Sequence, residues 1–254
     1  MLGERKIVHI TRQWPAAGVQ HLEINEVDGT INIEASDNNQ ITMDATVQTR
    51  VPGKPNQENQ GFFQTELNGD TLTIGRRGEH HWGFHWGLGG DEYFVTYNLR
   101  VPSNVSLDLR TVNGKIDTRG VDGETRATTV NGVVDIETSG ANEVEAKAVN
   151  GIIRAHFLKD FHGASFKTVN GRVVAVLPPT ASFSGDFTQV NGDVEAAFPL
   201  SIHSHPGSRR VSGEVNGGRY SLHIVTVNGD IKVENGGAPP TPPPPPATPP
   251  APST

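Results

Sequence analysis

The sequence contains no cysteine among its 254 residues. This absence excludes disulfide bridges, zinc sites built on cysteine and a thiol nucleophile. The chain also lacks an apolar run of the roughly 18 residues that a membrane-spanning helix needs, so we expect no transmembrane segment. Residues 1–10 lack the apolar core of a signal peptide. We therefore expect either a cytoplasmic protein or a mature chain from which a signal has been removed.

Basic residues are scarce as well, since 21 Lys and Arg face 28 Asp and Glu and give a formal net charge of -7. No basic cluster is interleaved with aromatic residues, so nucleic acid is not an expected partner. The sequence carries no phosphate-binding loop, no dinucleotide fingerprint and no Ser-His-Asp order. We accordingly expect no cofactor and no catalytic residues.

The chain is rich in glycine, with 29 residues, and in proline, with 18. This composition favours short strands separated by turns. The tripeptide Val-Asn-Gly recurs about every 20 residues, a period that is typical of repeat architectures. Its copies are centred on Asn113, Asn131, Asn150, Asn170, Asn191, Asn216 and Asn228.

Apolar residues keep fixed positions relative to the repeated asparagine, although the Asn216 copy fits poorly. Each repeat is therefore predicted to carry two short strands, and each strand is apolar on one face. The residues three places after Asn are Ile116, Val134, Ile153, Val173, Val194 and Ile231. The residues four places before it are Leu109, Ala127, Ala146, Phe166, Phe187 and Ile224.

Two all-β architectures fit this pattern. Asn-Gly between strands is a strong hairpin signal, which would give an antiparallel β meander of Asn-Gly hairpins. In a parallel β-solenoid, coils would stack about 4.8 Å apart, with asparagine amides in a hydrogen-bonded ladder and glycine at a corner with positive φ. We favour the solenoid, because a meander does not need so many identical turns. Its expected Asn-Gly corners are Asn113, Asn131, Asn150, Asn170, Asn191 and Asn228.

The expected organisation has three parts. Residues 1–19 are interpreted as a lead-in, and residues 20–235 as the repeat domain with an insertion at 75–91. Residues 236–254 are expected to be a proline-rich disordered tail, because ten prolines in 238–254 favour an extended polyproline II chain that cannot pair in a sheet.

The insertion holds the densest cluster of chemically versatile side chains. His81 and His85 are candidate metal ligands, since imidazole suits zinc. Trp82, Phe84 and Trp86 are candidate contacts for a glycan or a protein partner. The alternative is a purely structural loop that folds over an end or flank of the solenoid.

Acidic residues recur shortly after the glycines of the repeat. In a stacked solenoid they would form an acidic stripe, which we interpret as a solvated outward face. Weak calcium binding and a polysaccharide-acting enzyme with grouped carboxylates are the alternatives. The residues are Asp117, Asp135, Glu137, Asp193, Glu195 and Asp230.

Several phrases of the sequence are similar to one known family. Leu99-Arg100-Val101-Pro102 precedes a strand, and Thr111-Val112-Asn113-Gly114-Lys115-Ile116 opens a series of Val-Asn-Gly turns. Over roughly residues 20–235 the chain resembles a bacterial family of candidate adhesin domains of unknown function, which carries repeated T-x-N-G-x-I phrases. The resemblance implies a right-handed parallel β-helix exported to the cell envelope or surface, and it supplies no catalytic residue.

These observations together predict a non-enzymatic, adhesin-like structural or binding protein of the cell envelope or extracellular space. Its expected partners are a glycan or a cell-surface protein, and copies of the chain that associate into a homo-oligomer or filament. Two alternatives stay open: a polysaccharide-acting β-helix enzyme and a cytoplasmic scaffold.

Overall fold

The computed structural model describes residues 6–49, 62–76, 93–205 and 208–237. In these ranges every regular element is a β-strand, which confirms the all-β prediction, and no helix could cross a membrane. The strands are β1 (Lys6–Pro15), β2 (His21–Asn25), β3 (Asp28–Ala35), β4 (Gln40–Thr49), β5 (Phe63–Asn68), β6 (Thr71–Arg76), β7 (Tyr93–Val101), β8 (Ser106–Arg119), β9 (Thr125–Thr138), β10 (Val144–Phe157), β11 (Ala164–Asn170), β12 (Val173–Leu177), β13 (Phe183–Asn191), β14 (Val194–Ala196), β15 (Ser201–His205), β16 (Ser208–Val215), β17 (Tyr220–Asn228) and β18 (Ile231–Asn235).

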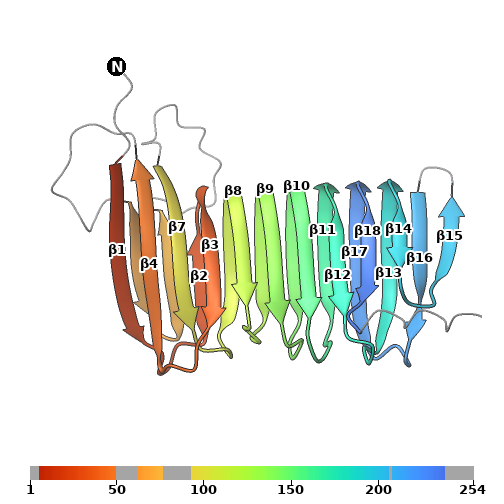
Figure 1. Cartoon of the computed structure of the whole chain (residues 1–254), viewed down its shortest axis with the longest axis horizontal. Helices are drawn as coiled ribbons and strands as arrows, with labels where there is room; N and C mark the ends of the chain where they lie inside the picture. The colour runs from red at the N-terminus through yellow and green to blue at the C-terminus, as the bar shows by residue number, and fades with distance from the viewer. Residues whose placement is uncertain (1–5, 50–61, 77–92, 206–207, 238–254) are drawn as a thin grey trace, which may run out of the picture.

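The repeats lie side by side along the long axis of the molecule (Figure 1). Neighbouring repeats pair in parallel with asparagine opposite asparagine: Asn113 with Asn131, Asn131 with Asn150, and Asn150 with Asn170. These parallel pairings exclude the antiparallel meander for this part of the chain. Each repeat contributes one strand segment before Val-Asn-Gly and one after it, and in β8, β9 and β10 a single strand runs through the tripeptide.

The core lies between these two sets of strand segments. Residues three places after Asn, such as Ile116, Val134 and Ile153, are fully buried, and so are Phe166 and Ile224, four places before it. Alternation along each strand sends the residues in between outward. The inward positions predicted from the repeat are thus confirmed for these residues.

Both ends of the sheet are antiparallel, so the sheet as a whole is mixed. At one end β1 pairs with β4, and β4 pairs with β7; at the other, β16 pairs with both β13 and β15. Strand β1 lies within the segment interpreted as a lead-in, and all of its ten residues pair with β4.

The last repeat does not stack in sequence order. Strand β17 lies between β11 and β13, and β18 lies between β12 and β14, as the blue strands among the teal ones show in Figure 1. The expectation that successive coils stack on one another is therefore wrong at this point. The chain crosses the start of β13, because Phe183 pairs with Val215 on one edge and with Tyr220 on the other.

A tight turn makes this crossing and explains why the Asn216 copy fits the repeat poorly. Asn216, Gly217 and Gly218 all have positive φ, at 47°, 88° and 63°. This backbone region is costly for most residues, but asparagine and glycine tolerate it. The Asn216 copy is thus a reversal of the chain, which the other copies are not.

In four of the six stacked repeats the glycine has a different role from the one expected, whereas Gly192 and Gly229 have the positive φ that was predicted. Gly114, Gly132, Gly151 and Gly171 are absent from the positive-φ residues of the described chain, so the predicted left-handed corner is wrong at these four. A Cβ on Gly132 would instead approach the carbonyl oxygen of Gly114 to less than 3.0 Å. Glycine is required here because the backbones of neighbouring coils approach too closely for a side chain.

Beside the glycines, the asparagine amides form the expected ladder. Each Nδ2 donates to the Oδ1 of the neighbouring coil, and Asn113 donates to Asp28 at the end of the row. Because a carboxylate only accepts hydrogen bonds, Asp28 is a suitable terminal member. The donor–acceptor distances are 2.7–2.9 Å, and the row runs Asp28, Asn113, Asn131, Asn150, Asn170, Asn228 and Asn191.

Candidate functional site

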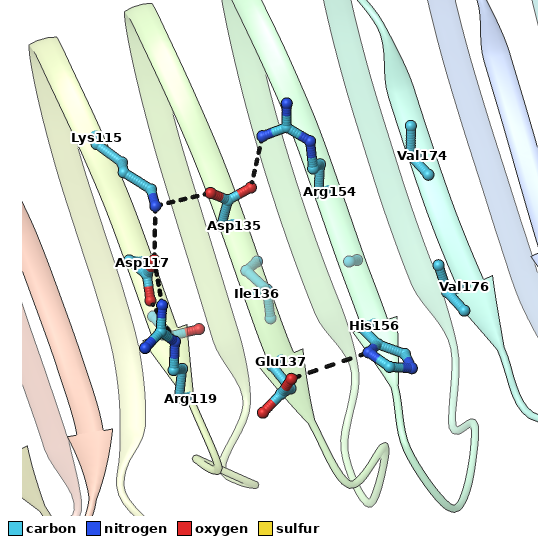
Figure 2. Close-up of a pocket in the computed structure, with 12 residues that line it drawn as sticks. Lys115, Asp117, Arg119, Asp135, Ile136, Glu137, Arg154, His156, Val174 and Val176 are labelled. Carbon is cyan, nitrogen blue, oxygen red and sulfur yellow. Dashed lines mark hydrogen bonds and ion pairs between the residues drawn. The ribbon is translucent and has the colours of Figure 1, made fainter. Parts of the chain in front are cut away.

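The most structured polar surface is formed by outward side chains on the strand segments that follow Asn-Gly in β8, β9, β10 and β12. They surround a shallow hollow of about 300 Å³ (Figure 2). Its position follows from the repeat, since residues at even spacings after Asn point away from the core. The outward lining residues are Lys115, Asp117, Arg119, Asp135, Glu137, Arg154, His156, Val174 and Val176, and the buried Thr118, Ile136 and Ala155 lie beneath them.

An ion network connects three neighbouring strands across this face. The Nζ of Lys115 lies 2.7 Å from Asp117 Oδ2 and 2.9 Å from Asp135 Oδ2. Arg119 Nε lies 3.1 Å from the other oxygen of Asp117, and Arg154 Nη1 lies 3.0 Å from the other oxygen of Asp135. Each carboxylate is therefore held between two cations (Figure 2).

The network shifts the ionisation of its central members. Hydrogen bonds to Asp117 and Asp135 raise the pKa of Lys115 above its ordinary value. Partial burial acts to raise the pKa of Asp135, but hydrogen bonds from Lys115 and Arg154, with the attraction of their charges, outweigh it and lower that pKa. Both groups are thus held in their charged forms.

The predicted acidic stripe is wrong, because cations and an apolar residue enter it. Across the sheet, Asp117 lies beside Asp135 and Asp135 beside Arg154; Val174 and Lys232 follow. The outward face is therefore a mixture of both charge signs with an apolar margin. Lower on the same face, His156 Nδ1 lies 3.9 Å from Glu137 Oε2.

We expect Asp135→Asn to weaken the acid sensitivity of the fold. Because the pKa of Asp135 is lowered in the folded chain, its contribution is present above the ordinary carboxyl pKa and is lost as pH falls through the lowered value. Asp135 and its partners Lys115 and Arg154 are partly exposed. The substitution should therefore lower the free energy of unfolding at neutral pH by less than about 1 kcal/mol. Urea unfolding at pH 7 and at acidic pH checks this, with the exposed Asp37→Asn as the control. An unchanged pH dependence in Asp135→Asn would contradict the role of the network.

The sequence-predicted site at the insertion is not tested by the structure. His81, His85, Trp82, Phe84 and Trp86 all lie outside the described residues. Within the described ranges, no group of three or more histidine, aspartate or glutamate side chains could hold a metal ion. These five residues remain predictions.

Sequence reasoning found the carboxylates of this face but missed their cationic partners. Lys115 stands two residues before Asp117, and Arg154 occupies in its repeat the place that Asp135 occupies in the preceding one. Reading the repeats as stacked rows would have placed these charges together. The arrangement can fix a rigid polar surface, since its central carboxylates are already neutralised by neighbouring side chains.

The fold and this face define the class of the protein: an all-β repeat protein whose stacked strands present long, regular surfaces. The family model described as Toastrack DUF4097 matches residues 105–234, just over half of the chain. The chain belongs to this family. No curated protein matches it in sequence.

Several solved structures have a similar fold at low sequence identity. A candidate cell adhesion protein from Clostridium sporogenes ATCC 15579 is 11% identical, with 91% of this chain and 100% of that chain covered and a TM-score of 0.45. A candidate adhesin from Bacteroides fragilis NCTC 9343 is 10% identical, with 89% and 96% covered and a TM-score of 0.34. At these values the likeness does not bear on function.

Proposed function

We propose that the protein is a non-enzymatic, adhesin-like structural and binding protein of the cell envelope or extracellular space. In this proposal a right-handed parallel β-solenoid with Asn-Gly corners presents long binding faces. The observation that carries the proposal is the ion network of Lys115, Asp117, Asp135 and Arg154, whose members neutralise one another across three strands. These ion pairs hold the side chains of the face in fixed positions without a bound ligand. A surface with fixed side chains is suited to binding a partner.

Self-association is a subsidiary part of the proposal. Strand β1 pairs with β4 along one edge, no other strand of the described residues pairs with it, and it forms one end of the row of strands in Figure 1. An unpaired strand edge is a template for pairing with another chain. Light scattering over a wide concentration range checks this, and a constant monomer mass would exclude it.

Binding to surfaces is the direct test of the main proposal. The full chain should cosediment in a saturable manner with bacterial cells, envelope fractions or secreted polymers, and heat-unfolded protein serves as the control. Absence of saturable binding to all three would overturn the proposal. Release of reducing ends from a polysaccharide panel would favour the enzymatic alternative instead.

A further inference from the structure

A second regular surface runs along the edge of the molecule where each repeat passes through Val-Asn-Gly. We call it the Val-Asn ridge: the asparagine ladder together with the valine that precedes each asparagine. Both side chains of each pair point outward in the last four rungs. The exposed fractions are 41% for Val149, 42% for Val169, 37% for Val227 and 42% for Val190, and all six asparagines of the ladder are exposed.

The ladder leaves hydrogen-bonding capacity on this surface. A side-chain amide has two N–H donors and an oxygen with two lone pairs. In the ladder, an internal member such as Asn150 donates once, to Asn131, and accepts once, from Asn170. Each internal rung therefore retains one donor and one lone pair for an external partner, fixed in direction because its other bonds hold the amide.

The ridge is also uncharged along its length, since its repeated residues are valine, asparagine and glycine and only the terminal Asp28 is acidic. It differs in this from the charged face beside it. An uncharged row of amides and methyl groups suits a ligand that offers hydroxyl groups and apolar C–H surface together. The ridge itself offers no counter-charge to a phosphate or carboxylate polymer, and three of the cations that flank it, Lys115, Arg172 and Lys147, are already paired with carboxylates of the protein.

We propose that the Val-Asn ridge binds a linear, uncharged polysaccharide lying along the stacking axis. Neighbouring rungs are about 4.8 Å apart, the spacing of paired strands, which is close to the length of one sugar residue in an extended chain. Successive sugars can thus place hydroxyls on successive amides and C–H faces on successive valines. This inference rests on the proposed function and names the class of ligand for it.

The width of the ridge favours a thin polymer over a second copy of the protein. It is one valine and one asparagine wide, because charged residues stand close on either side of the tripeptide. Lys115 and Arg172 come two residues after their asparagines, and Lys147 and Lys167, which lie opposite each other, come three residues before theirs. A stable protein complex buries about 800 Å² on each partner, far more than a single row of valines offers. A polymer chain instead gains affinity from many weak contacts in a row.

The dependence of affinity on ligand length tests the inference. The probes are neutral β-1,4-linked oligomers of glucose and of N-acetylglucosamine, two to eight residues long, with the full chain in calorimetry. Affinity should rise with each added sugar and level off at about six or seven residues, when the ladder is filled. Affinity that is independent of length, or absence of binding to every neutral oligomer, would overturn the inference.

Matched variants locate the site. Val169→Asp combined with Val227→Asp should lower the affinity for the longest oligomer at least about tenfold, because it replaces two apolar contacts by hydrated carboxylates without removing a ladder amide. Leu158→Asp is the control, since Leu158 is 46% exposed and lies directly after the end of β10, away from the Val-Asn-Gly segment in the middle of that strand. Equal losses in both variants would contradict a ridge site. Saturable binding to cells that survives the double variant would overturn this inference and leave the proposed function standing.

Discussion

Replacing Gly132 by alanine is expected to remove most of the free energy of unfolding, more than about 4 kcal/mol. The added Cβ would lie under 3.0 Å from the carbonyl oxygen of Gly114, a distance that real Cβ atoms essentially never show. This oxygen belongs to backbone, and both strands are paired in register on either side of the contact. The coils can make room only by separating, which would break the asparagine ladder beside them.

Gly75→Ala in β6 is the matched control. A Cβ at this position would meet Asn25 at 3.5 Å or more, in ordinary contact, and Gly75 does not have positive φ. Its effect should stay within about 1 kcal/mol. Urea unfolding followed by circular dichroism compares the two. If Gly132→Ala costs no more than Gly75→Ala, the close approach of the coils is not what requires glycine.

The comparison of these glycines shows what the sequence could reveal about the repeat. Spacing alone predicted which residues face the core, because side-chain direction alternates along a strand and the repeat fixes its phase. It also predicted that asparagines stack. It could not separate a glycine needed for positive φ from one needed for close approach, since both requirements select the same residue.

The candidate site was predictable only in part, for a related reason. The acidic residues Asp117 and Asp135 could be placed on the outward face from their spacing. The partners that neutralise them come from the same strand, as Lys115 does, and from a neighbouring coil, as Arg154 does. The charge of this face can therefore be predicted only when the stacking order of all the coils is known. The last coil, β17 and β18, does not stack in sequence order.

The sequence of a single repeat does not determine which other repeats it stacks against. Every copy from Asn113 to Asn228, apart from Asn216, carries similar inward residues and the same Asn-Gly register, so any two copies can stack. The decisive element is the β15–β16 hairpin. Strand β16 occupies one edge of β13, which leaves the other edge for β17.

Because β17 and β18 are internal to the stack, removing them should have a large effect. A chain that ends at Gly218 loses the buried side chains of Leu222, Ile224, Ile231 and Val233, each contributing about 1.5–3 kcal/mol. It also leaves β11 and β13 without their shared neighbour. We expect this chain to unfold or aggregate, whereas one that ends at Gly237 should have the melting temperature of the full chain. Equal melting temperatures for the full chain and the two shortened chains would contradict an internal position of β17 and β18.

Pairs of introduced cysteines separate the two stacking orders directly, because the natural chain has none. In the structure Lys167 lies opposite Val225, and stacking in sequence order would instead place Lys167 opposite Thr188. Neighbouring strands bring Cα atoms close enough for a disulfide. Lys167→Cys with Val225→Cys should therefore oxidise to a crosslinked monomer, and Lys167→Cys with Thr188→Cys should keep free thiols, because β17 separates β11 from β13. The reverse result, read by thiol titration and mass spectrometry after proteolysis, would show that the coils follow the order of the sequence.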